Sequence, residues 1–102
     1  MDSMRVLCGR EKPLPIYKSV IACLENPQVF PDMVEPIYRE AINLDDETLD
    51  RFRFALLRLQ LYADIHRNED LEKAMEIKYV AQVLEKVVFG TLMMEREEFA
   101  AD

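Results

Sequence analysis

Proline and glycine are distributed very unevenly along this chain, and that distribution limits the folds open to it. All five prolines lie between positions 13 and 36, and the two glycines are at positions 9 and 90. Residues 37–89 therefore lack the two residue types that most often end a helix or form a turn. One polar segment, HRNED at 66–70, interrupts this stretch. The distribution predicts two long helices joined by a short turn.

Capping residues indicate where these two helices begin and end. Asp45 can cap a helix that starts at the next residue, and Asp46 and Glu47 place negative charge near the positive end of its dipole. Asn68 suits a left-handed position at the end of this helix, and Asp70 suits the N-cap of the following one. We expect the second long helix to run from 71 to about 99.

The N-terminal part of the chain is expected to be more broken. Two short helices are predicted, one at 16–24 and one from the prolines near 31–36 to Asn43, because proline is favoured in the first turn of a helix. The segment before them contains RVLC, which either adds a short strand or packs as extended chain. The expected organisation is an arm at 1–15 and a single helical-bundle domain at 16–102.

The stretch RFRFALLRLQLY, residues 51–62, alternates charged and apolar residues like a strand, but the alternation changes phase at its centre. A helical period divides its apolar residues into two stripes. The first stripe is Phe52, Ala55, Leu56, Leu59 and Ala63, and the second is Phe54, Leu57, Leu61 and Ile65. The gaps between the stripes hold Arg51 and Arg58 on one side, and Arg53, Gln60 and Asp64 on the other. Because a surface helix needs only one apolar face, we expect this helix to be covered on both sides.

The final helix has one broad apolar stripe, which is expected to cover one side of the central helix as an antiparallel hairpin. The two short helices either cover the remaining apolar surface or leave part of it bare. Met75, Phe89 and Met93 lie off the main stripe of the last helix, where they either fill the core or form a partner site that the arm leaves open. The predicted fold is all-α, a small bundle of about four helices, either monomeric or dimeric.

Composition narrows the classes of partner. The formal charge of −7 argues against non-specific nucleic-acid binding, which needs clustered Lys and Arg. No segment reaches the ~18 apolar residues of a membrane span, so we expect a cytoplasmic protein without a membrane partner. Cys8 and Cys23 lack a zinc-ligand spacing. They are expected to be reduced thiols, Cys23 in the core and Cys8 nearer the surface.

Few residues suggest a catalytic, metal-binding or ligand-binding role. His66 is the only histidine, and its spacing to Asp70 would allow a shared metal, but Asp70 is needed as a cap, so we expect an exposed histidine at a helix end. Arg51 and Arg58, two turns apart, could hold an acidic partner or a phosphate, or be neutralised by neighbouring carboxylates. No Walker loop, dinucleotide fingerprint or nucleophile elbow is present. We expect no enzyme activity, no cofactor, no metal and no small-molecule substrate.

The leading hypothesis is a non-catalytic module for protein–protein interaction or assembly, which presents an apolar and acidic helical surface as a homodimer or as a subunit of a complex. The candidate interaction residues are Phe52, Phe54, Leu57, Leu61, Ile65, Met75, Phe89, Met93, Arg51 and Arg58. They combine the two stripes of the central helix with the apolar residues that lie off the stripe of the last one.

The alternative is an acidic inhibitor or adaptor, of the kind carried by phages and mobile elements, that occupies a basic nucleic-acid-binding surface on a target protein. It requires the carboxylates at 45–50, 69–76 and 95–102 to lie on one side of the molecule. A helical nucleic-acid binder that uses the basic N-terminal arm fits the overall charge less well.

Overall fold

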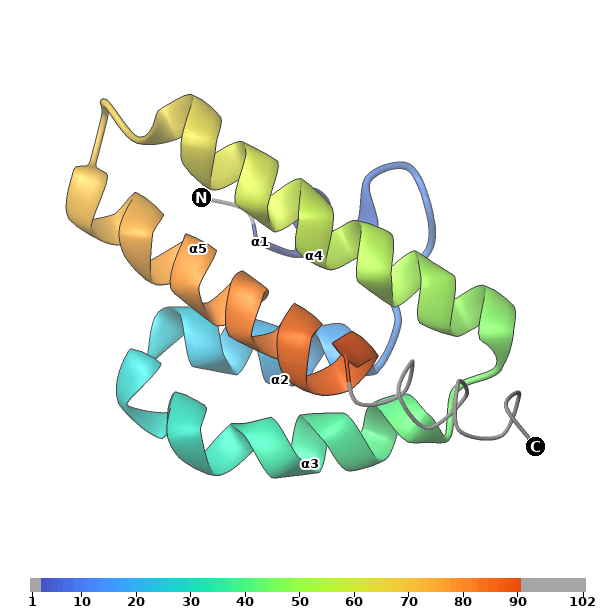
Figure 1. The fold of residues 1–102 in the computed structure, drawn as a ribbon. Coiled ribbons are helices and arrows are strands. Elements are labelled where there is room, and N and C mark those ends of the chain that lie inside the picture. Colours follow the sequence, from blue (N-terminus) through green and yellow to red (C-terminus); the bar gives the residue numbers. More distant parts are fainter. Residues whose placement is uncertain (1–2, 91–102) are drawn as a thin grey trace.

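The computed structural model describes residues 3–90, and within that range the chain is a helical bundle without β-strands. Its elements are α1 (Ser3–Cys8), α2 (Ile16–Glu25), a 3-10 turn (Pro27–Val29), α3 (Phe30–Ile42), α4 (Asp46–His66), α5 (Leu71–Leu84) and a π-helical turn (Glu85–Gly90), as Figure 1 shows. The predicted all-α fold is confirmed. The described part of the chain has one helix more than expected, because the N-terminal arm is itself helical.

The first helix, α1, replaces the strand or extended segment that we expected for RVLC. Leu7 is completely buried and Cys8 nearly so. A six-residue helix is not stable in isolation, and α1 is held by packing along α4 and by hydrogen bonds from Arg58 to the carbonyls of Val6 and Leu7. Gly9 follows it with a φ of 58°, the left-handed conformation that commonly ends a helix.

Helices α4 and α5 form the predicted antiparallel hairpin, which runs diagonally across Figure 1. Both predicted caps are present: Asp45 accepts a 2.7 Å hydrogen bond from the amide of Thr48, and Asp70 accepts a 3.1 Å bond from the amide of Lys73. The prediction of a left-handed Asn68 is wrong, since Gly9 is the only residue between 3 and 90 with a positive φ. The turn between the helices closes through a backbone bond from Glu69 to the carbonyl of His66.

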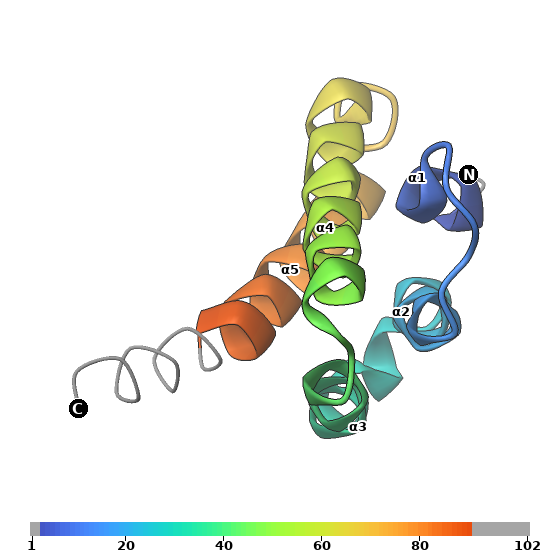
Figure 2. The ribbon, with the colours of Figure 1, turned by 90° about the vertical axis from the view of Figure 1, so that its right-hand side faces the viewer.

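The core lies between α4 and the other helices. In Figure 2, α1 and α2 lie on one side of α4 and the later turns of α5 on the other. Aromatic rings form its centre: the Phe52 ring centroid is 6.4 Å from that of Tyr17 on α2 and 5.9 Å from that of Phe89 in the π-helical turn. The other fully buried large side chains are Leu7, Ile16, Val20, Cys23, Ile37, Leu56, Leu59, Val80, Leu84 and Val88.

The π-helical turn changes the expected position of Phe89. A regular α-helix would place this ring off the apolar stripe of the last helix, on its polar side. A π-turn contains more residues than an α-helical turn and therefore rotates the side chains at its end about the helix axis. Phe89 is buried against Phe52, so its prediction as an exposed interaction residue is wrong.

Candidate interaction surface

The two apolar stripes of α4 have different environments. Phe52, Ala55, Leu56, Leu59 and Ala63 of the first stripe are all buried. The second stripe is in solvent, with exposed fractions of 60% for Phe54, 36% for Leu57, 61% for Leu61 and 73% for Ile65. The expectation that this helix is covered on both sides is therefore wrong for the single chain. We call Phe54, Leu57, Leu61 and Ile65 the outer stripe.

The polar gap that contains Arg51 and Arg58 is where the N-terminal arm packs. Arg58 donates from Nε to the carbonyl of Val6 at 3.2 Å and from a terminal nitrogen to the carbonyl of Leu7. Arg51 forms an ion pair with Glu11 and donates to the carbonyl of Lys12 at 2.6 Å. Both arginines thus bind the chain's own arm, and the arm covers this gap instead of the outer stripe.

The opposite gap is where α5 and the π-helical turn pack. Gln60 donates to Glu85 at 2.6 Å, and Lys78 donates to Asp64 at 2.8 Å. The guanidinium of Arg53 lies 5.8 Å from the ring centre of Phe89, within cation–π range. The two neighbours of α4 are therefore attached along its two polar gaps, and the outer stripe lies between these attachments on the side away from the core.

The exposed apolar surface continues onto α5 at the turn end of the hairpin. Leu71 and Met75 are largely exposed, and they line a hollow of about 250 Å³ together with Ala63, Asp64 and other residues. Asp64, which lines the hollow, is three positions after Leu61 on α4 and so is its neighbour on the helix surface, which places the hollow beside the outer stripe. Met75 is in solvent, so of its two alternatives it does not fill the core of the single chain.

Two of the candidate residues, Phe52 and Phe89, take no part in this surface. Phe52 is completely buried because its stripe is the one that α2 and the π-helical turn cover, so it is removed from the surface with Phe89. Met93 lies outside the described residues. Leu71 was missed from the sequence, because it appears there only as the first residue after a cap.

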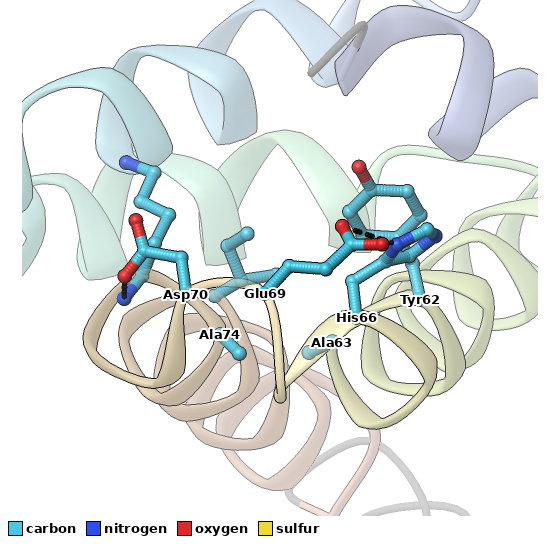
Figure 3. Close-up of a pocket in the computed structure, with 8 residues that line it drawn as sticks. Tyr62, Ala63, His66, Glu69, Asp70 and Ala74 are labelled. Carbon is cyan, nitrogen blue, oxygen red and sulfur yellow. Dashed lines mark hydrogen bonds and ion pairs between the residues drawn. The ribbon is translucent and has the colours of Figure 1, made fainter.

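His66 lies in a second hollow at the same end of the hairpin (Figure 3). Its Nδ1 is 2.9 Å from a carboxylate oxygen of Glu69, and its ring stacks on Tyr62 with centroids 4.3 Å apart. The hollow measures about 170 Å³, below the roughly 300 Å³ at which ligand pockets usually begin. Between residues 3 and 90, no three His, Cys, Asp or Glu side chains are grouped so that they could hold a metal ion.

The two described acidic segments lie at opposite ends of α4. Residues 45–50 are at the start of α4, and residues 69–76 follow its end. A helix of this length separates them by about 30 Å at 1.5 Å per residue. The segment 95–102 lies outside the described residues. The acidic-inhibitor alternative, which requires all three segments on one side of the molecule, therefore stays a prediction.

The buried titratable groups belong to the core. Burial raises the pKa of the Cys23 thiol and also that of the Tyr17 hydroxyl, the latter against the opposing effects of Arg58 and Arg51. Cys8 is buried as well, so the expectation that it lies near the surface is wrong; it is covered where α1 packs on α4. Both cysteines are free thiols.

Comparisons with protein-family models, with curated proteins and with solved structures found no match to this chain. Within residues 3–90, none of the helices combines the length and the apolar character needed to cross a membrane.

Proposed function

We propose that this chain is a non-catalytic protein interaction module whose binding surface is the outer stripe of α4. The observation that carries the proposal is the exposure of Phe54, Leu57, Leu61 and Ile65 on a helix whose opposite stripe is fully packed. Single exposed apolar residues are common on proteins, but a continuous row of four is typical of a contact site.

The spacing of the outer stripe suits a helical contact. Its residues follow one another at intervals of three, four and four, so they form a ridge along one face of α4. Such ridges are the form in which helices enter grooves or pack on other helices. The polar gaps on both sides are already occupied, one by α1 and the other by α5 and the π-helical turn, which leaves this ridge as the open side of the helix.

Site-specific photo-crosslinking in the cells that produce the protein would test the proposal. A benzophenone side chain placed at Leu61 or Ile65 should form adducts with another polypeptide, and one placed at the exposed Lys18 of α2 should not. Leu57→Glu in the same chain should remove the adducts, because it places a charge in the middle of the ridge. Yields at Leu61 and Ile65 no higher than at Lys18 would contradict the proposal.

A further inference from the structure

We infer that the occupant of the outer stripe is a second copy of this chain, with the two α4 helices antiparallel about a two-fold axis that passes between Leu57 and Leu61. This inference rests on the proposed function, since it names the partner of the same surface. Three features of α4 support it: the order of its apolar side chains, the order of the charges beside them, and the apolar area exposed.

The apolar residues of the outer stripe are self-complementary about this axis. When two copies of α4 run antiparallel about a centre between Leu57 and Leu61, Leu57 of one copy lies opposite Leu61 of the other. Phe54 then lies opposite Ile65, because the two residues are nearly the same number of positions from the centre. A two-fold contact requires that one patch fit itself in this way.

The charges beside the stripe are complementary in the antiparallel arrangement alone. Asp50, Arg53, Asp64 and Arg67 follow in that order along α4 and its C-cap, and all four are exposed, although Asp64 also pairs with Lys78 and Arg53 lies against Phe89 within the chain. About the same centre, Asp50 lies opposite Arg67 of the second copy, and Arg53 lies opposite Asp64. A parallel pair in register would instead place each charge opposite its own copy. Such like-charge contacts oppose association.

The exposed apolar area matches what a stable contact needs. At ~200 Å² for a fully exposed large side chain, the exposed fractions of the four residues amount to about 450 Å². A standard interface buries about 800 Å² on each partner, of which somewhat more than half is apolar. The outer stripe alone therefore supplies the apolar share of such an interface, and the four flanking charges lie where its polar rim would be.

Sedimentation equilibrium of the full chain, from micromolar to near-millimolar concentration, tests the inference directly. The expected species has twice the 12.0 kDa mass of one chain. Leu61→Glu should weaken the dimer at least ~100-fold, as substitutions at the centre of an interface do. Tyr79→Glu is the matched control: Tyr79 is equally exposed but lies beside Phe30 of α3. It should leave the dissociation constant almost unchanged.

A charge exchange tests the antiparallel orientation. Asp50→Arg and Arg67→Asp should each weaken the dimer by roughly five-fold, since each dimer contains the pair twice. The double variant should return to nearly wild-type affinity. Within one chain these residues are about 25 Å apart along α4, so a rescue reports contact between copies.

The possible results separate this inference from the proposed function. A chain that is monomeric at every concentration, or a dimer that Leu61→Glu leaves intact, overturns the inference. If adducts at Leu61 and Ile65 then contain a different protein, the proposed function is still supported. Failure of both crosslinking and dimerisation refutes both proposals. A dimer that Leu61→Glu disrupts but the charge exchange does not restore refutes the antiparallel orientation.

Discussion

Leu59 and Leu61 are two positions apart on α4, and their side chains lie on opposite faces of this helix. Substituting each of them tests which face of α4 belongs to the core. Leu59 is completely buried, and Leu61 keeps 61% of its surface exposed. We expect Leu59→Ala to lower the free energy of unfolding by about 3 kcal/mol. Leu61→Ala should lower it by less than about 1 kcal/mol.

The size of the difference comes from packing. Replacing a buried leucine by alanine removes apolar groups worth about 0.8 kcal/mol each, and the cavity left behind adds a further cost. At Leu61 most of the removed surface is already in water, and no cavity forms. Alanine is the best helix former, so the backbone effect is small, favourable and equal at the two positions. The comparison therefore isolates the burial of each side chain.

Urea unfolding followed by circular dichroism would measure both values, at dilutions at which the midpoint no longer depends on protein concentration. An unchanged dependence of the unfolding free energy on urea would show that the denatured state is the same in each variant. If Leu61→Ala lowered the free energy of unfolding as much as Leu59→Ala under these conditions, the outer stripe would be packed within its own chain. The assignment of the interaction surface would then be refuted.

Three further predictions concern other contacts. Arg58→Met should lower the free energy of unfolding by about 1–3 kcal/mol and accelerate amide hydrogen exchange in α1, because it removes the hydrogen-bond donors that hold this helix. Unchanged exchange in α1 would argue against that role. Cys8 and Cys23 should react slowly with thiol reagents in the folded protein, because both are buried and burial raises the pKa of Cys23; rapid labelling of either would contradict the packing. Asp45→Ala should lower the melting temperature at neutral pH, and the difference in melting temperature between wild type and variant should become smaller only below about pH 4. Hydrogen bonds from Thr48 hold the pKa of Asp45 below its usual value. The stabilisation by the Asp45 carboxylate is therefore complete above the unfolded-state pKa and is lost as the pH falls. A difference in melting temperature that stayed constant down to about pH 2.5 would refute this.

The long hairpin could be predicted because its determinants are local. Asp45 and Asp70 are caps that act within one turn of their own helices. The phase change at the centre of residues 51–62 excludes a strand without reference to any other part of the chain. The two stripes of α4 and the polar gaps between them followed from the same local periodicity.

Which stripe is buried could not be read from α4 itself, because the two stripes are similar in size and composition. The choice depends on where α1 and α5 attach, and those contacts join residues far apart in sequence, such as Arg58 with Val6 and Gln60 with Glu85. Phe89 was misplaced for a different reason. The π-helical turn breaks the regular period on which the assignment of its face depended.

The hydrogen bonds between Arg58 and α1 also affect the order in which the chain folds during synthesis. Val6 and Leu7 are synthesised before Arg58, which is added 52 and 51 residues later. At bacterial or eukaryotic elongation rates this delay is on the order of 3–10 s. A helix as short as α1 cannot persist alone for that time. Helix α1 therefore stays exposed to chaperones until the middle of α4 has been synthesised, and it packs only then although it is made before α4.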